Sequence, residues 1–281
     1  MKRRRWLKYL SLSIGTLMGI LIVLAIIYSQ LSFRVLLGFG SLDTYNGNNE
    51  RGNKIMNYAI SNIEDKDEQI YHGLSVQNTK NGNYNIAIAA LEKAFGINPK
   101  EVAAYYGWLL LYYYHDYEKA LEILDYCDAL TPNFSDAPMA EDIHKLKGLA
   151  HMQLENYEKA IEEFNLNINE TTETIGEDWV DVYTFVNKGR CLSAQNKHKE
   201  SIEAFQTALN NYQECTEAYY YMALDQLEIK EEELACKNLN TAYALVKKGY
   251  KNTDIYIEYF HEVYEQEIEI SILTHCTNTP K

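Results

Sequence analysis

The sequence predicts an all-α protein in which a transmembrane helix precedes a solenoid of about five stacked helix pairs. Two observations support this prediction. Small and apolar residues recur at fixed offsets along residues 68–250, and an uncharged apolar run of 18 residues follows a basic N-terminus.

The offsets are clearest in Gly82–Pro99, which carries Ala87, Leu91, Ala94 and Pro99 at successive intervals of four, three and five. The intervals return, in full or with losses, at Ala120, Leu124, Cys127 and Pro132; at Ala160 and Phe164; at Ser201, Phe205 and Ala208; and at Ala235, Leu239 and Ala242. Residues four and three apart share one face of a helix, and proline cannot continue a helix. The intervals therefore predict the second helix of each pair.

A further small residue stands twelve positions before four of these five leading small residues, and it allows the two helices of a pair to approach closely. These residues are Ser75, Gly148, Gly189 and Ala223. Gly107 precedes Ala120 by thirteen positions instead, which indicates one inserted residue. A single pair cannot bury its apolar face, so the copies are expected to stack.

These small–aromatic–small–proline marks resemble the tetratricopeptide repeat (TPR), a helix–turn–helix unit of roughly 34 residues. The resemblance covers about residues 68–250. It implies a right-handed superhelix of helix pairs. It also implies that the first helix of each pair lines a concave groove, which receives an extended or helical peptide.

The predicted organisation is a basic flank and single transmembrane helix at 1–37, a linker at 38–54, an N-terminal capping helix at 55–66, the repeat array at 68–250, and a C-terminal capping helix at 254–273. Abundant Gly and Asn indicate the linker. Apolar residues at helical spacing indicate the two capping helices. A terminal helix with a more polar outer face suits the open end of a solenoid.

The N-terminal segment has the length and flanking charges of a membrane anchor. The run Leu10–Ile27 contains no charge, and a bilayer core needs about 20 mostly apolar residues. A cleaved signal peptide is the alternative, but its apolar core is shorter and ends at a pair of small residues, which Ile27 and Ser29 do not provide. Basic residues gather before the run, so the N-terminus is predicted in the cytoplasm and the array outside.

Charge and motif content disfavour several function classes. The formal net charge is −14, and residues after position 34 hold 20 basic against 40 acidic side chains, so a nucleic-acid partner is not expected. No phosphate-binding glycine loop and no HExxH motif occurs. His144 and His151 lie two helical turns apart without an identifiable third ligand. The sequence therefore predicts neither an enzyme nor a cofactor or metal site.

The five cysteines are odd in number and contain no CxxC. Cys127 and Cys236 fall on second helices and are expected to be small buried residues. A disulfide between Cys191 and Cys215 stays open, because sequence does not fix pairing.

The resemblance implies a partner-binding groove at the exposed first-helix positions His72, Val76, Trp108, Tyr112, Lys145, Met152, Val186, Arg190, Tyr220 and Leu224. The inserted residue leaves Tyr113 as an alternative to Tyr112. Tyrosine and tryptophan concentrate binding energy at interfaces, which favours this surface. Lys145 and Asn187 lie near positions where some TPR modules hold a C-terminal carboxylate, but Leu149 and Leu224 replace the polar partners needed. Carboxylate binding is therefore not expected.

The predicted function is a membrane-anchored, non-enzymatic scaffold that binds a peptide or protein in the groove, as an accessory subunit of an envelope complex. The alternative is a homo-oligomerising module at the membrane. An enzyme that uses the array to hold its substrate would need catalytic groups that the sequence does not reveal.

Overall fold

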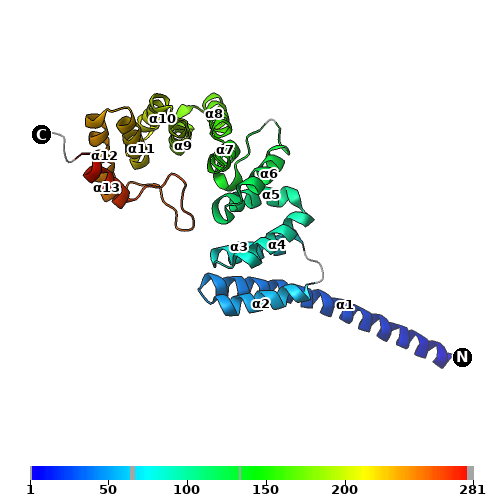
Figure 1. Ribbon diagram of the computed structural model, residues 1–281. Coiled ribbons are helices and arrows are strands. Elements are labelled where there is room, and N and C mark those ends of the chain that lie inside the picture. The colour runs from blue at the N-terminus through cyan, green and yellow to red at the C-terminus, as the bar shows by residue number, and fades with distance from the viewer. Residues whose placement is uncertain (1, 64–66, 133, 277–281) are drawn as a thin grey trace. The chain divides into compact units, whose positions relative to one another are not determined.

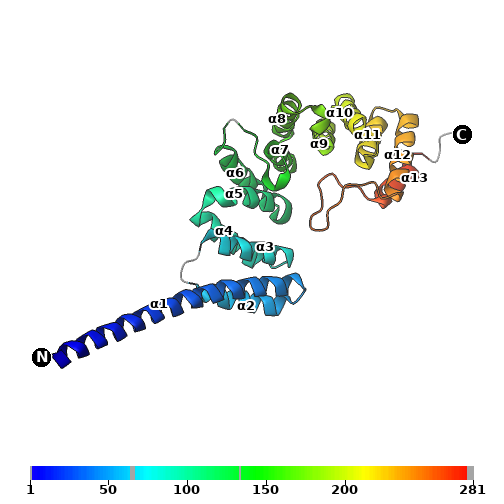
Figure 2. The same ribbon diagram turned by 180° about the vertical axis from the view of Figure 1, so that it is seen from behind.

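The computed structural model describes residues 2–63, 67–132 and 134–276, and the regular elements in these ranges are all helical. The chain divides into two compact units, Met1–Val102 and Ala103–Lys281. Figures 1 and 2 show both units as antiparallel helices packed in neighbouring pairs. Helix α5 (Pro99–Leu109) contains the boundary between the units.

The first unit begins with a long helical hairpin. Helix α1 (Lys2–Tyr45) continues without interruption to the turn before α2 (Asn49–Asn62), and the second pair consists of α3 (Glu68–Lys80) and α4 (Tyr84–Ile97). The predicted linker at 38–54 is therefore wrong, because these residues form the end of α1 and most of α2. The predicted capping helix at 55–66 is the remainder of α2, which ends at Asn62.

The hairpin α1–α2 follows the same packing rule as the repeats. Gly40 precedes Gly52 by twelve residues, and Met56 and Ala59 follow at offsets of four and three. Both glycines are at the crossing, where a Cβ atom on Gly52 would lie 2.6 Å from the carbonyl oxygen of Gly40. The segment was interpreted as a loop because it is rich in Gly and Asn, whereas its glycines serve close helix contact.

The apolar part of α1 is long enough to cross a membrane. The most apolar stretch of 18 residues within Thr16–Tyr45 has a mean hydropathy of 2.2, and none of that stretch is buried. No other helix in the described ranges has this length and composition. The same helix supplies Thr44, whose hydroxyl donates to the side-chain oxygen of Gln77 on α3 at 3.2 Å. The apolar span and the start of the helical array therefore share one helix.

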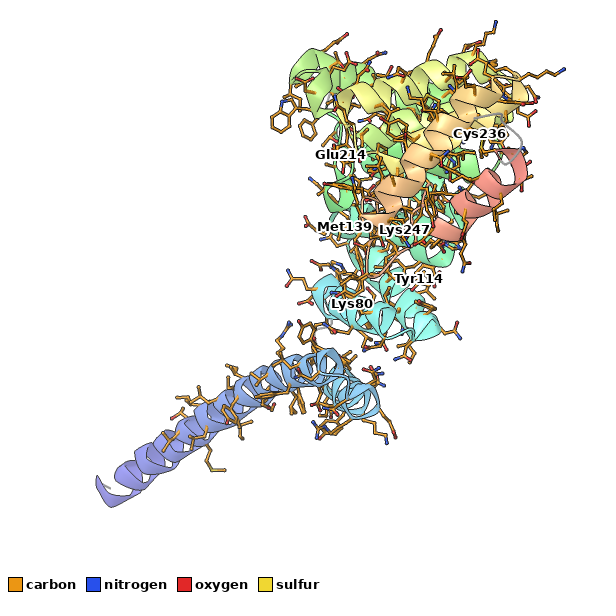
Figure 3. All side chains as sticks on the ribbon, turned by 90° about the vertical axis from the view of Figure 1, so that its left-hand side faces the viewer. Lys80, Tyr114, Met139, Glu214, Cys236 and Lys247 are labelled. Carbon is orange, nitrogen blue, oxygen red and sulfur yellow. A yellow bond between two sulfur atoms is a disulfide. The ribbon has the colours of Figure 1, made fainter. Side chains whose placement is uncertain are left out.

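The second unit contains the remaining helix pairs and a terminal helix (Figure 3). After α5 and the π-helical turn η1 (Leu110–Tyr114), these are α6 (Tyr117–Asp128), α7 (Ile143–Gln153), α8 (Tyr157–Thr174), α9 (Val182–Ala194), α10 (His198–Asn211), α11 (Thr216–Glu228), α12 (Glu232–Lys247) and α13 (Glu265–His275). Short 3-10 turns, η2 (Pro138–Ala140) and η3 (Glu177–Trp179), lie in the two long inter-repeat loops.

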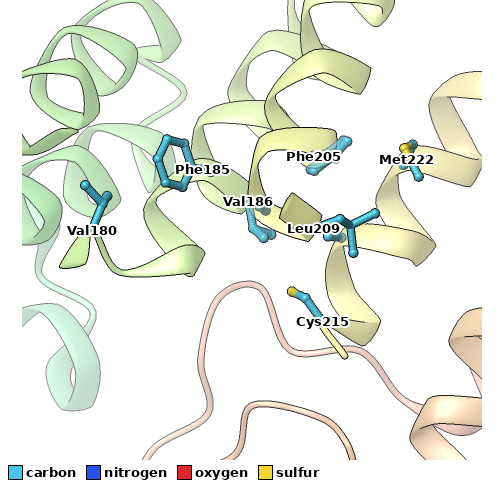
Figure 4. Packing of buried hydrophobic residues seen from close by; sticks show 9 residues of the cluster. Val180, Phe185, Val186, Phe205, Leu209, Cys215 and Met222 are labelled. Carbon is cyan, nitrogen blue, oxygen red and sulfur yellow. The ribbon is translucent and has the colours of Figure 1, made fainter. Parts of the chain in front are cut away.

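Glycines on first helices meet large side chains on second helices, as the twelve-residue offset predicts. A Cβ atom on Gly148 would lie 2.6 Å from the ring of Phe164, and one on Gly189 would lie 2.6 Å from the ring of Phe205. Figure 4 shows Phe205 within a buried cluster that includes Val186 and Met222. The interior of each pair therefore depends on a glycine that leaves room for a ring.

The thirteen-residue spacing after Gly107 has a structural counterpart. Helix α5 ends in the π-helical turn η1, which accommodates one extra residue within a helix. Gly107 still faces the second helix, since a Cβ atom on it would lie 2.7 Å from Leu124. The extra residue is thus absorbed by the π-turn, and the contact within the pair is kept.

The C-terminal region differs from its prediction. The expected helix 254–273 is helical only from Glu265 onward, where α13 begins, and the preceding residues have no regular structure. A disulfide joins Cys236 on α12 to Cys276 after α13, so Cys236 is not the unpaired buried residue that was expected. Cys191 and Cys215 are buried free thiols, so the pairing left open for them does not form.

Candidate functional site

The first helices of the second unit contact a segment of their own chain. Residues 251–264, here called the inserted segment, leave the end of α12 and run back toward α7 and α9 before α13 begins (Figures 1 and 2). We call the side chains of α5, η1, α7, α9 and α11 that contact this segment or line the cavity beside it the first-helix surface. This surface corresponds to the groove predicted from the repeats.

His261 is the most deeply buried polar residue of the inserted segment, with 2% of its surface exposed. Its ring stacks on Tyr183 of α9 at a centroid distance of 4.2 Å and on Tyr259 at 5.4 Å. The ring nitrogen Nδ1 lies 3.2 Å from the amide nitrogen of Asn187, and Nε2 lies 2.9 Å from that of Asn252. A neutral imidazole donates at one nitrogen and accepts at the other, so both amides can be satisfied if one presents its oxygen.

Several charges surround this imidazole. Burial lowers the pKa of His261 well below its usual value, and the nearby cations Lys145 and Arg190 lower it further. Glu217 on α11 is also buried, and burial raises the pKa of its carboxyl group. The site therefore holds an uncharged ring at neutral pH.

Phe260 makes the second aromatic contact. Its ring stacks on Tyr112 of η1 at 5.5 Å, with an angle of 14° between the ring planes. Its backbone oxygen accepts a hydrogen bond from the Arg190 guanidinium at 2.5 Å. Arg190 in turn lies over the ring of Tyr221 at 4.8 Å, which fixes the guanidinium between α9 and α11.

Backbone groups of the segment bind α11 as well. The backbone N–H of Asn252 donates to the Glu217 carboxylate at 2.7 Å, and the Tyr221 hydroxyl donates to the backbone oxygen of His261 at 3.4 Å. The Thr216 hydroxyl donates to the backbone oxygen of Tyr250, just before the segment. These contacts do not depend on the segment's side chains, and an extended peptide of another sequence could repeat them.

A charged network occupies the other end of the surface. The carboxylate of Glu141 accepts from the Trp108 indole and the Tyr112 hydroxyl, each at 3.0 Å, and from Lys145 at 2.7 Å. Lys145 also donates to Asp181 at 2.6 Å. Burial alone would lower the pKa of Lys145, but the Asp181 and Glu141 carboxylates outweigh it and raise the pKa. Lys145 is therefore a fully charged, fully paired cation.

A cavity of about 350 Å³ remains between this network and the inserted segment. Lys145 and Asp181 line it from the helices, and Asp254, Ile257 and Tyr259 line it from the segment. The segment therefore covers the charged end of the surface without filling it.

The structure separates the ten predicted groove residues. His72 and Val76 lie on α3 in the first unit, half-buried. Trp108, Tyr112, Lys145 and Arg190 line the first-helix surface. Tyr220 and Leu224 lie half-buried on α11, and Tyr220 belongs to the packing around α13. Partner binding at these positions stays a prediction.

The expected exposure is wrong for four of these residues. Tyr112, Lys145, Met152 and Val186 are all buried. Val186 belongs to the apolar cluster between α9, α10 and α11, and Tyr112 is covered by Phe260. The repeat register alone could not reveal this, because part of the cover is a segment outside the repeats.

Sequence reasoning missed Tyr183, Glu141 and Tyr221. Tyr183 stands four residues before Asn187 on α9, so both lie on the face that includes Arg190. That spacing was a usable signal. Glu141 lies in a loop before α7, and no periodicity indicates its contacts with α5 and η1.

The two histidines considered as metal ligands do not form a site together. The Nδ1 atom of His144 lies 2.8 Å from a carboxylate oxygen of Glu163, and this hydrogen bond raises the pKa of His144 although burial opposes it. Burial lowers the pKa of His151. Within the described ranges, no group of three His, Cys, Asp or Glu side chains is placed to hold a metal ion.

Comparison with known proteins supports the repeat interpretation. Two sequence models described as tetratricopeptide repeat match residues 68–101 and 140–214. No curated protein matches the sequence. A structure of MamA residues 41–end from Desulfovibrio magneticus RS-1 has a TM-score of 0.54 at 17% identity, over 64% of this chain and 96% of that one.

Another solved MamA structure has a TM-score of 0.52 at 18% identity and covers 67% of this chain and 97% of that one. At these identities the likeness shows the fold alone. The fold, the offsets and the two matching repeat models agree that the chain contains tetratricopeptide repeats.

Proposed function

We propose that the protein is a non-enzymatic scaffold, anchored in a membrane by α1, that binds a peptide or protein partner on the first-helix surface. One observation carries the proposal: the surface already holds a non-helical peptide, the chain's own residues 251–264, through side-chain and backbone contacts from η1, α9 and α11. A surface that orders one peptide segment has the shape and polar groups to order another. An accessory role in an envelope complex fits this arrangement.

The chemistry of the surface favours protein over nucleic acid. Its cations Lys145 and Arg190 are engaged by carboxylates and by a backbone oxygen, and the chain beyond residue 34 carries twice as many acidic as basic side chains. A phosphate backbone would meet net repulsion. Stacked aromatic rings and hydrogen bonds to carbonyl groups instead suit a polypeptide.

The proposed topology places residues 1–8 in the cytoplasm and the repeats outside. Basic residues precede the apolar part of α1, as expected for a cytoplasmic N-terminus. The disulfide between Cys236 and Cys276 adds support, since such bonds persist mainly in oxidising compartments.

Partner capture by the full-length protein in detergent tests the scaffold proposal. Trp108→Ala removes an aromatic side chain of the surface, and Trp179→Ala removes one that is 72% exposed in η3, in the loop before α9. Loss of a buried aromatic anchor weakens binding by about 2 kcal/mol or more. We expect capture of membrane-extract proteins to fall only with Trp108→Ala. Loss of capture with Trp179→Ala but not with Trp108→Ala would place the binding site in the loop and contradict the proposal.

Protease added to intact cells, or to spheroplasts if an outer membrane is present, tests the topology. The repeats should be degraded without lysis. If the repeats resist the protease until the cells are lysed, the extracytoplasmic placement of the array is contradicted.

Self-assembly is the second candidate, and one observation favours it: the ligand seen on the surface belongs to this chain, so a second copy carries the same peptide. The mass of the detergent-solubilised protein across a concentration range distinguishes the two. A protein that stays monomeric at all concentrations would exclude self-assembly. An oligomer that dissociates into monomers on Trp108→Ala substitution would favour self-assembly over the scaffold.

A further inference from the structure

The inserted segment is bound as a ligand would be bound. It has no helical structure of its own, and it contacts first helices that precede it by about 40 to 150 positions in the sequence. Two of its backbone oxygens, those of Phe260 and His261, accept hydrogen bonds from Arg190 and Tyr221. Phe260 and His261 stack on rings of η1 and α9, and near the segment's end Val263 packs into the apolar cluster of α12 and α13.

We propose that residues 251–264 are an intramolecular competitor that closes the first-helix surface, and that the partner is a non-helical peptide with the same chemistry: an aromatic residue followed by an uncharged planar hydrogen-bonding residue. This inference deepens the proposed function and rests on it. Partner binding and insertion of the segment then exclude one another.

The aromatic preference follows from the position of Phe260. Its ring stacks on Tyr112 and lies 6.1 Å from the ring of Tyr117. Offset and edge contacts of this kind favour an aromatic side chain over an aliphatic one. The Arg190 hydrogen bond to the adjacent carbonyl oxygen fixes the register of the peptide without reading its side chain.

The preference for an uncharged planar group follows from the position of His261. From α9, Tyr183 stacks on the ring and the Asn187 amide meets Nδ1, while Tyr259 and Asn252 of the segment itself meet the ring and Nε2. Lys145 on α7 and Arg190 on α9 face it as cations, while the Glu217 carboxyl on α11 binds the segment's backbone instead. A lysine or arginine at this position would add a third cation beside Lys145 and Arg190, whereas a neutral histidine, asparagine or glutamine would not.

The segment is tethered at both ends, which makes it an effective competitor. Its first residue follows α12, and the Cys236–Cys276 disulfide holds the far end of α13 on α12. A tethered ligand acts at a high effective concentration, so a free peptide must displace it. The tip of the loop is exposed, with Ile255 87% accessible, so a partner can reach the segment there before it displaces the buried residues.

The test uses the full-length protein in detergent and a fluorescent synthetic peptide of residues 251–264, KNTDIYIEYFHEVY. The release variant combines Phe260→Ala and His261→Ala, which removes both ring contacts of the internal segment. The matched control combines Thr253→Ala and Ile255→Ala, two exposed positions in the same segment. Circular dichroism and thermal unfolding establish that each variant is folded.

We expect the release variant to bind the peptide at least ten-fold more tightly than the wild type and the control, since a site that is open one tenth of the time binds ten-fold more weakly. Adding Arg190→Ala to the release variant should abolish the gain. A second peptide with alanine in place of Phe260 and His261 should bind poorly to all forms. Equal affinity of the peptide for wild type and release variant would overturn the competitor inference.

If the release variant does not fold, Cys276→Ser supplies an independent route, because it removes one tether while keeping every contact. Tighter peptide binding by that variant is the expected result, and unchanged binding would overturn the inference. Failure of the scaffold proposal alone gives a different result. The synthetic peptide then binds the release variant more tightly than the wild type, but Trp108→Ala does not change the capture of proteins from membrane extracts.

Discussion

The interior of each helix pair and the first-helix surface are built on the same helices, but different interactions stabilise them. Inside a pair, Gly148 or Gly189 leaves space for a ring on the next helix, and the contact is apolar and local. On the first-helix surface, stacked rings, buried amides and paired charges bind a distant segment. The interior should therefore respond to side-chain volume, and the surface to charge, pH and the tether.

The largest expected effect comes from removing the tether. The Cys236→Ser/Cys276→Ser variant opens a link with a sequence separation of 40, which the chain-entropy estimate values at about 4 kcal/mol of unfolding free energy. Denaturant unfolding measures the loss. A thiol reductant should destabilise the wild type to the same degree and leave the variant unchanged. Equal sensitivity of both proteins to the reductant would show that the disulfide does not hold this end of the chain.

Gly148→Leu tests the interior of a pair. A larger side chain there meets the Phe164 ring, and overpacking of this kind costs about 1–3 kcal/mol or more. Gly73→Leu on α3 is the matched control, because a Cβ atom at Gly73 meets nothing within 4 Å. Thermal unfolding should show a clear loss for the first variant and none for the second. Similar losses would mean that the pair interior does not depend on the glycine.

A pH series tests the surface. The folded-state pKa of His261 lies below its unfolded value near 6.5, so the unfolded chain binds more protons below pH 6.5, and stability falls as pH decreases. The loss is up to about 1.4 kcal/mol per pH unit until the folded pKa is reached. His261→Gln keeps a planar hydrogen-bonding group that does not titrate.

Urea unfolding at pH 7.5 and pH 5.5 should therefore show a smaller difference for His261→Gln than for the wild type. Burial also lowers the pKa of His151, so the variant should retain part of the dependence. His144 acts in the opposite direction: its raised pKa contributes stability at acid pH that is lost as pH rises. Identical differences for the two proteins would place His261 in contact with water.

The smallest effect is expected at the tip of the inserted segment. Ile255→Ser changes a side chain that is 87% exposed, and surface changes of this kind lie within about 0.5 kcal/mol. Thermal unfolding should not distinguish it from the wild type. A loss as large as that of Gly148→Leu would show that the tip packs against protein.

The two regions were not equally predictable from sequence. The offsets that identify a pair reflect contacts between neighbouring helices, so Gly148, Phe164 and the residue inserted after Gly107 were all readable. The contacts of the first-helix surface join residues such as Asn187 and His261, which are 74 positions apart, and no periodicity in the sequence predicts these contacts.

Local preferences misled in two places. The apolar residues of 254–264 fit helical spacing, yet many are β-branched or aromatic, and such residues accept an extended backbone when distant contacts favour it. In residues 38–54, Gly40 and Gly52 indicated a loop by composition, although their spacing of twelve matched the repeats. Composition outweighed spacing in that interpretation, and spacing was the better guide.

The continuity of α1 has a mechanical consequence at the proposed membrane. A helix of 44 residues is about 66 Å long, whereas a bilayer core is about 30 Å thick. If α1 crosses the membrane as proposed, the remainder would project from the lipid as a rigid helix, and its last turns pack against α2 through the contact of Gly40 with Gly52. With no flexible joint in between, the height and tilt of the first helix pair above the lipid headgroups would follow the tilt of this helix. In a protein anchored in this way, lateral diffusion in two dimensions, not the length of a flexible linker, would limit how this unit meets its partners.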